Sequence, residues 1–338
     1  MQTDDLAFVA RSLVAKGKGL LAADESLPTI EKRFAALGIP SNEETRRAYR
    51  DMLLSTPGIE EFISGVILFD ETLHQKAGNG ISFVQTLVKK GIIPGIKVDM
   101  GTVPLPGFPG EKITTGLDGL EKRLNEYRTL GARFTKWRAV LTIGPDIPTY
   151  AAMTANATLL AIYAAHAQEA GLVPIVEPEV LMDGDHGIER CEQVTREMLD
   201  ILFGALGTYR IFLEGMLLKP NMVLAGKQST QKAEVKEAAE ATIRTLRRTV
   251  PSAVPGIVFL SGGQSPESAT EHLNAMNKMG PHPWEISFSF ARALQDYAMK
   301  EWAGSASNRA AAQRAFYIRA RYTSEARNGF YGGEAMPR

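Results

Sequence analysis

The sequence has almost no cysteine and no excess of either charge. Cys191 is the single cysteine among 338 residues, so no internal disulfide can form and a reducing compartment is expected. The 38 lysines and arginines balance the 38 aspartates and glutamates, and the basic residues form no block. This balance argues against a protein that binds nucleic acid, because the phosphate backbone is held by many basic contacts.

Targeting segments and long apolar runs are also missing. The first residues, MQTDDLAFVA, are acidic, whereas signal and transit peptides carry positive charge. Residues 147–168 lack charged side chains, but their proline, asparagine and threonines indicate a loop that runs into a helix, not a membrane span. We therefore expect a cytoplasmic protein without a membrane partner.

Motifs for nucleotides and metals are absent as well. The chain has neither GxGxxG nor GxxxxGK[ST], the glycine-rich patterns that hold nucleotide phosphates. Its five histidines show no HxxxH or HxH spacing. Asp183, Asp185 and His186 could be ligands, but carboxylates beside glycines are more typical of a turn. We expect no metal and no other cofactor.

Eight short apolar runs alternate with helical patterns. They span residues 19–24, 65–70, 93–99, 133–141, 172–180, 210–220, 256–263 and 284–290. Nearly continuous apolar strands between helices indicate parallel strands that are buried on both faces. Because no linker rich in proline, glycine or serine divides the chain, the pattern favours an α/β fold with one closed (β/α)8 TIM barrel, eight parallel strands surrounded by helices.

The two ends of the chain lie outside this repeating pattern. Residues 4–14 predict an extra N-terminal helix, with Leu6, Val9 and Leu13 on one face. Residues 328–338 are rich in glycine and are expected to form a flexible tail. The barrel domain is therefore expected to span residues 1–327.

Lysines lie within or at the end of several apolar runs. In a barrel the carboxyl ends of the strands meet at one mouth, and a charge inside an apolar strand is costly unless it is paired. Lys219 ends the sixth run and Lys136 lies within the fourth. An amine attacks a carbonyl only when it is neutral, a state that burial and a neighbouring cation favour. We interpret Lys219 as an imine-forming amine, the alternative being a strand-end lysine that extends to solvent.

Three carboxylates are candidate proton carriers. Glu177 and Glu179 alternate in the fifth run, so both point to one side of a strand, where they could move protons or form a structural ion pair with the lysines. Asp24 ends the first run and is the other candidate base. Its alternative role is to cap the next helix, which Ser26 could do instead.

The segment FLSGGQSPESA (259–269) is the clearest anion-binding motif. Its two glycines follow a strand, and Ser265 with Pro266 predicts the start of a helix whose positive end faces the same ligand. Barrels often bind phosphate after the seventh strand. Arg292, just after the eighth run, would complete the site. The alternative is an ordinary glycine turn and a surface arginine.

Seven segments together resemble the class I fructose-1,6-bisphosphate aldolases. They run in order between about residues 5 and 322: LLAADES, GIKVDMGTVPLPG, FTKWRAV, VPIVEPEVLMDGDH, FLEGMLLKPNMV, FLSGGQSPESA and SFSFARALQ. The resemblance implies a lyase of glycolysis and gluconeogenesis that reversibly cleaves fructose 1,6-bisphosphate to dihydroxyacetone phosphate and glyceraldehyde 3-phosphate. It also implies a homotetramer that needs no metal.

The resemblance implies a role for each candidate catalytic residue. Lys219 would form a Schiff base with C2 of the ketose. Asp24 would accept the proton of the C4 hydroxyl, and Glu177 would assist loss of water from the carbinolamine. Lys136 and Glu179 would adjust the charge of the site.

The resemblance also implies which residues hold the sugar phosphate. One phosphate would contact Ser261, Gly262 and Arg292. The second phosphate and the sugar would contact Lys97, Arg138, Arg33 and Thr29. Thr29 replaces the usual serine, Ala291 replaces a glycine, and no tyrosine ends the chain. Thr29 and Ala291 leave open a Schiff-base aldolase that prefers another ketose phosphate. A non-catalytic aldolase-like scaffold is a separate alternative.

Overall fold

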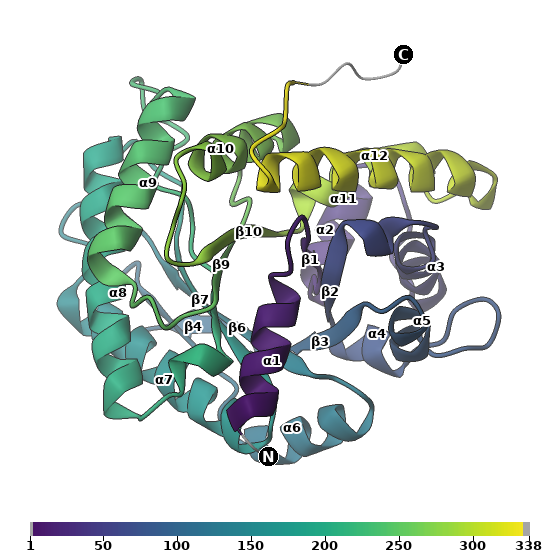
Figure 1. Cartoon of the computed structure of the whole chain (residues 1–338), viewed down its shortest axis with the longest axis horizontal. Coiled ribbons are helices and arrows are strands. Elements are labelled where there is room, and N and C mark those ends of the chain that lie inside the picture. Colours follow the sequence, from purple (N-terminus) through teal and green to yellow (C-terminus); the bar gives the residue numbers. More distant parts are fainter. Residues whose placement is uncertain (1–2, 334–338) are drawn as a thin grey trace.

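The computed structural model describes residues 3–333, and the strands at its centre form a closed parallel barrel (Figure 1). Within these residues, the order around the barrel is β1, β2, β3, β6, β7, β8, β9 and β10, which returns to β1. Their bounds are Gly19–Ala23, Ile63–Leu68, Ile93–Lys97, Phe134–Leu141, Val173–Val180, Leu217–Leu218, Gly256–Phe259 and Glu285–Phe290. The predicted TIM barrel is confirmed.

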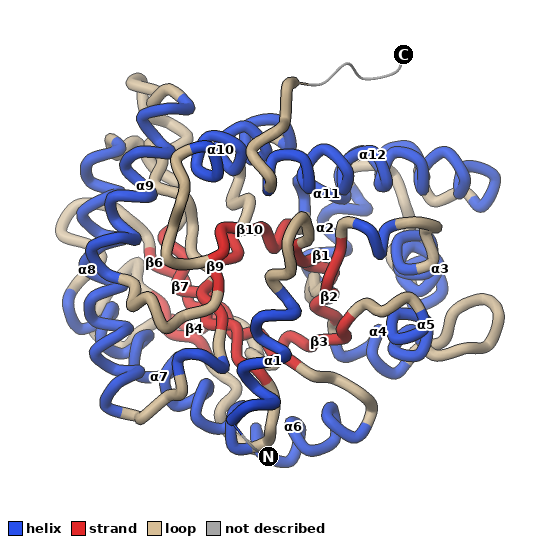
Figure 2. The backbone as a smooth tube through the Cα atoms, viewed as in Figure 1, coloured by secondary structure: helices blue, strands red, loops and turns tan. Residues whose placement is uncertain are grey.

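Helices surround the strands on the outside of the barrel, as the blue segments around the red ones show (Figure 2). The described α-helices are α1 (Thr3–Leu13), α2 (Leu27–Ala35), α3 (Glu43–Leu54), α4 (Asp70–His74), α5 (Phe83–Lys89), α6 (Leu120–Thr129), α7 (Tyr150–Glu169), α8 (Ile188–Thr208), α9 (Val235–Thr249), α10 (Pro266–Lys278), α11 (Arg292–Trp302) and α12 (Arg309–Arg327). Three short 3₁₀ helices, η1 (Ile59–Glu61), η2 (Leu213–Gly215) and η3 (Ala306–Asn308), complete the described helical segments.

Helix α1 covers the amino-terminal end of the barrel, in front of the strands in Figure 1. Its apolar face packs against side chains from the barrel interior. Gly65 within β2 and Gly256 at the start of β9 permit the close approach of this segment. A Cβ on Gly65 would lie 2.7 Å from Cδ2 of Leu13, and one on Gly256 would lie 2.6 Å from Cγ1 of Val14. The predicted N-terminal helix is confirmed, and it leaves the opposite end of the barrel for a site.

The part of the barrel interior next to α1 is apolar. Inward side chains from the strands meet there: Leu20, Ala22, Ile67, Phe134, Val173, Ile175, Leu217 and Val258. Phe134 fills the space beside Gly95, where a Cβ would lie 2.3 Å from the ring. Burial of this layer and of the larger layer between strands and helices supplies the main driving force for folding.

Two local features differ from the sequence prediction. In the sixth run, only Leu217–Leu218 form a strand, because the preceding Leu213–Gly215 turn packs against α1. An antiparallel hairpin of β4 (Thr102–Pro104) and β5 (Lys112–Thr114) was not predicted. Its strands are short and largely exposed, so they lack the apolar alternation that identifies a half-buried strand.

The predicted tail is only partly described. Residues 334–338 lie outside the described residues. In the described part, Tyr331 is buried against Tyr322, with ring centroids 6.0 Å apart, and its N–H donates to Oδ1 of Asn274 at 3.1 Å. The division into a barrel at 1–327 and a flexible tail at 328–338 remains a prediction.

Candidate active site

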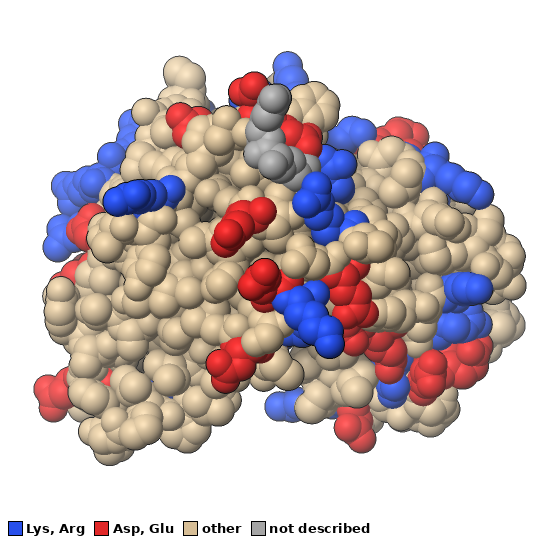
Figure 3. Space-filling view, turned by 90° about the horizontal axis from the view of Figure 1, so that it is seen from below, with Lys and Arg blue, Asp and Glu red and all other residues tan. Residues whose placement is uncertain are grey.

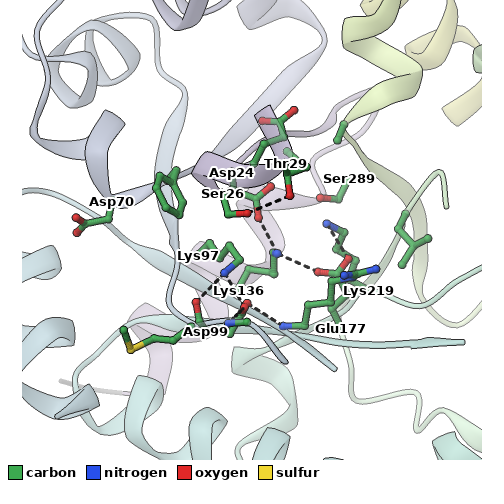
Figure 4. A pocket seen from close by; sticks show the side chains of 18 of the residues that line it. Asp24, Ser26, Thr29, Asp70, Lys97, Asp99, Lys136, Glu177, Lys219 and Ser289 are labelled. Carbon is green, nitrogen blue, oxygen red and sulfur yellow. Dashed lines mark hydrogen bonds and ion pairs between the residues drawn. The ribbon is translucent and has the colours of Figure 1, made fainter. Parts of the chain in front are cut away.

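A cavity of about 940 Å³ opens at the carboxyl ends of the barrel strands. It lies at the opposite end of the barrel from α1, as expected for a TIM barrel. Most of the residues that the sequence predicts for the site line it: Asp24, Thr29, Lys97, Lys136, Arg138, Glu177, Glu179, Lys219, Ser261, Gly262 and Arg292. Figure 4 shows Asp24, Lys136, Glu177 and Lys219 pointing toward one another.

The two-residue period of the strands explains this convergence. On β6, Phe134 belongs to the apolar layer and Lys136 follows two positions later. On β7, Ile175 precedes Glu177 in the same way, and on β8, Leu217 precedes Lys219. One inward face therefore changes from apolar to charged as each strand approaches the mouth.

Glu177 lies between the two lysines. Its Oε1 is 3.2 Å from Nζ of Lys219, and its Oε2 is 3.3 Å from Nζ of Lys136. Lys136 also reaches Oδ2 of Asp24 at 2.6 Å. Lys219, Lys136 and Glu177 are each only 3% exposed. Four ionisable groups are thus held out of bulk water at distances that allow proton transfer.

The environment fixes the charge of Asp24 and Lys136. Burial acts to raise the pKa of Asp24, but Lys136 and Lys219 outweigh it and lower that pKa to about 2. Burial acts to lower the pKa of Lys136, but Asp24 and Glu177 hold it well above its usual range. At neutral pH, therefore, the site presents a carboxylate at Asp24 and an ammonium at Lys136.

The depressed pKa of Asp24 predicts a pH-dependent contribution to stability. Because the folded-state pKa lies near 2, below the ordinary value of 3.8, the contribution is fully present above about pH 4 and is lost as the pH falls through 2. It amounts to about 2 kcal/mol, with about half left near pH 3. Urea unfolding of the wild type and Asp24→Asn tests this. The difference in unfolding free energy should shrink as the pH falls from 5 to about 3, and a constant difference would contradict the assignment.

A second set of ion pairs lies beside the first. Nε of Arg138 is 2.5 Å from Oε2 of Glu179. Burial acts to lower the pKa of Arg138, but Glu179 raises it above its usual range. Nζ of Lys97 is 2.6 Å from Oδ1 of Asp99, whose Oδ2 accepts the N–H of Arg138 at 3.2 Å. Asp99 therefore orients both cations, a role that the sequence did not predict for it.

The SGG segment forms a tight turn at the edge of the cavity. The N–H of Gln264 donates to the carbonyl oxygen of Ser261 at 2.9 Å, and Gly262 and Gly263 have φ angles of 27° and 85°. Helix α10 starts directly afterwards, where the Ser265 hydroxyl accepts the Ser268 N–H at 3.1 Å. The predicted helix start is confirmed, and its positive end faces the turn.

Arg292 and Thr29 line the cavity from two other elements. Arg292 is the first residue of α11 and makes no ion pair with the residues described in the structure. Thr29 is exposed on α2, and its hydroxyl lies 3.0 Å from the hydroxyl of Ser26, the N-cap residue of that helix. Asp24 does not cap α2. Arg292 and Thr29 can therefore contact a ligand without breaking an ion pair.

Arg33 is placed differently from the other candidates. It does not line the cavity, because its guanidinium is bonded to Glu25 and to two residues of α11, Gln295 at 3.2 Å and Asp296 at 3.0 Å. Glu25 also pairs with Arg50 at 2.7 Å. These bonds connect α2, α3 and α11 around Glu25, which itself lines the cavity.

Comparisons with known proteins agree on one family. The family model for class I fructose-bisphosphate aldolase matches residues 5–337. The chain is 53% identical to the probable fructose-bisphosphate aldolase class 1 of Xanthomonas campestris pv. campestris, over 98% of this chain and 100% of that protein. It is 51% identical to fructose-bisphosphate aldolase 4, cytosolic, of Arabidopsis thaliana, over 99% of this chain and 86% of that protein.

A solved structure agrees with these relatives. Fructose-bisphosphate aldolase from Plasmodium falciparum, in a complex with TRAP and a small-molecule inhibitor, superposes with a TM-score of 0.97 at 50% identity. The match covers 98% of this chain and 96% of that one. The chain belongs to the class I fructose-bisphosphate aldolases. It is a lyase that reversibly cleaves fructose 1,6-bisphosphate to dihydroxyacetone phosphate and glyceraldehyde 3-phosphate.

Several cavity-lining residues of this aldolase were not predicted for the site. Ser26 was considered only as a cap, although it lines the cavity. Ser289 also lines it, and its buried hydroxyl has no partner within residues 3–333. Asp70 also lines the cavity, and it lies apart from Asp24, Lys136, Glu177 and Lys219 in Figure 4. Serines within apolar strands give no sequence signal of their own, because a hydroxyl is common in any strand.

Three further features concern the described residues outside the site. The residues described in the structure contain no group of three histidine, cysteine, aspartate or glutamate side chains that could hold a metal ion. Among the same residues, no helix is long and apolar enough to cross a membrane. On the face drawn in Figure 3, basic and acidic side chains are interspersed, and neither sign covers a broad area.

Proposed function

We propose that Lys219 is the amine that forms the Schiff base with C2 of fructose 1,6-bisphosphate. The observation that carries this assignment is the burial of Lys219 at the mouth of the barrel, with Nζ 3.2 Å from Oε1 of Glu177. At that distance Glu177 can give a proton to the carbinolamine hydroxyl, which leaves as water when the iminium forms. Borohydride tests the assignment, because it reduces the imine to a stable secondary amine on the lysine that formed it.

The iminium then makes cleavage of the C3–C4 bond possible. Asp24, a carboxylate at neutral pH, takes the proton of the C4 hydroxyl. The O–H electron pair becomes the second bond of the aldehyde, and the C3–C4 pair moves to C2–C3 as the iminium nitrogen accepts the charge. Glyceraldehyde 3-phosphate leaves, and the product enamine stays on Lys219. Protonation of C3 and addition of water to C2 then release dihydroxyacetone phosphate and restore the amine.

Lys136 and Glu179 adjust the charge around this reaction. Lys136 contacts both Asp24 and Glu177, and it stabilises Asp24 as a carboxylate between proton transfers. Glu179 pairs with Arg138 and keeps its guanidinium at the wall of the cavity. Both residues act on groups that carry protons or contact the sugar.

The order of the strands suggests which phosphate binds where. Ser261 and Gly262 follow β9, next to the β8 strand that leads to Lys219, so they suit the phosphate on C1, beside the imine carbon. Arg292 would join them there. Thr29 comes shortly after Asp24, which acts at C4, so Thr29 with Lys97 suits the phosphate on C6. Arg138 would contact the sugar between them, and Arg33 would support this end by holding Glu25.

Substrate comparison tests the C6 assignment. Lys97→Met should lower kcat/KM for fructose 1,6-bisphosphate by about 10-fold to 100-fold, because it removes a charge-assisted hydrogen bond to phosphate. The same change should affect fructose 1-phosphate much less, since that substrate has no C6 phosphate. An equal loss on both substrates would contradict the assignment and would indicate that Lys97 supports the site as a whole.

We also infer that the enzyme works in the cytoplasm as a homotetramer. The single cysteine is buried, which suits a reducing compartment, and relatives from Arabidopsis thaliana and Spinacia oleracea are named as cytosolic or cytoplasmic. The tetramer follows from the family. Light scattering of the purified protein, with four times the monomer mass of 36.8 kDa expected, tests it.

A further inference from the structure

The Gly262–Gly263 turn is supported from outside the cavity by one lysine. A Cβ built on Gly263 would lie 2.6 Å from Cε and 3.0 Å from Nζ of Lys227. The side chain of Lys227 therefore rests directly on the turn. It does not line the cavity, and it meets the site at the glycine backbone.

Lys227 is itself held in place by a network between two loops. Its Nζ is 2.9 Å from Oδ1 of Asp183, and its N–H donates to the carbonyl oxygen of Met182 at 2.8 Å. Next to it, the Gln228 N–H donates to Gly184 at 2.9 Å, and Oε1 of Gln228 accepts the Gly184 N–H at 2.7 Å. The loop after β7 and the loop after β8 thus form one support beneath the turn that follows β9.

We propose that Lys227, held by Asp183, is a positioning residue for the C1-phosphate subsite. Its side chain keeps the Gly262–Gly263 turn in the conformation that presents backbone N–H groups to the phosphate. This inference rests on the proposed role of Ser261, Gly262 and Arg292. The side chains of Lys227 and Asp183 are 41% and 59% exposed to solvent, so their ion pair contributes little to folding stability. A change in phosphate binding after mutation would therefore report on the turn.

The test uses Lys227→Gln with a matched control, Lys236→Gln. Lys236 lies on α9 in an exposed pair with Glu240 at 3.8 Å, and its replacement removes the same charge but leaves the Lys227 contacts in place. For Lys227→Gln we expect KM for fructose 1,6-bisphosphate and the inhibition constant of inorganic phosphate to rise about 5-fold to 10-fold. We expect kcat within about two-fold and an unchanged melting temperature. Lys236→Gln should change none of these values, and an equal effect of both variants would overturn the proposal.

The variant Asp183→Asn distinguishes two ways in which Lys227 could act: by holding the turn, or by attracting the phosphate through its charge. If Lys227 acts by holding the turn, loss of its partner should raise the phosphate inhibition constant. If it acts only through its charge, removal of the neighbouring carboxylate should lower that constant, and the proposal is wrong. Arg292→Ala checks the subsite itself. If that variant weakens phosphate inhibition while Lys227→Gln does not, only the inference about Lys227 fails, and if Arg292→Ala has no effect, the subsite assignment fails.

Discussion

Replacement of Lys219 by methionine is expected to abolish cleavage of fructose 1,6-bisphosphate, with kcat lowered by about 10⁴-fold or more. Methionine has a similar length but no amine, so no iminium can form and the C3–C4 electron pair has no acceptor. The fold should survive, because Glu177 keeps its contact with Lys136 at 3.3 Å and is not left as an unpaired buried charge. A coupled assay for triose phosphates and a thermal melt measure the two effects.

The melting temperature of Lys219→Met shows whether its loss of activity comes from lost chemistry or from a damaged fold. A melting temperature within a few degrees of the wild type, together with loss of cleavage, means that the lysine acts in the chemistry. A large fall in melting temperature would mean that Lys219 is a structural lysine. Full activity of the folded variant would exclude the Schiff-base assignment to this position.

Replacement of Asp24 by asparagine is expected to lower kcat for cleavage by about 10²-fold to 10⁴-fold, the range for loss of a general base. Asparagine cannot take the proton of the C4 hydroxyl. Dihydroxyacetone phosphate has no C4, so the variant should still form an imine with it at Lys219. Borohydride trapping with dihydroxyacetone phosphate should therefore remain close to the wild-type level.

In Asp24→Asn, cleavage should therefore be lost while borohydride trapping is kept. If trapping falls as far as cleavage, Asp24 is needed for imine formation and its role as the C4 base is wrong. Glu177→Gln provides the matched comparison, since Glu177 acts in loss of water from the carbinolamine. That variant should slow trapping and cleavage together.

The convergence of the central side chains could be predicted from the sequence, because it obeys a simple geometric rule. Lys136 and Glu177 stand on barrel strands and Lys219 directly follows one, and each lies two positions beyond an inward apolar residue. Period-two alternation and the convergence of parallel strands are enough to bring such groups together. The turn at Gly262 and Gly263 and the helix start after it could be predicted for a similar reason, since the glycines and the helix cap, Ser265, are adjacent in the chain.

Contacts that do not follow from the strand pattern could not be predicted. Arg33 is a candidate ligand for phosphate by its position after Asp24, but two of its three partners come from α11, about 260 positions later. The support of Gly263 by Lys227 likewise depends on how two loops meet. Asp99 contacts Lys97 and the backbone of Arg138, and only the packing of β3 against β6 brings these groups together.

Borohydride reduction of the enzyme with dihydroxyacetone phosphate tests the central claim most directly. After proteolysis, mass spectrometry should find one modified lysine, at Lys219, with incorporation lost in Lys219→Met. An unmodified Lys219, or an adduct at Lys136 or Lys97 in the active wild type, would contradict the account.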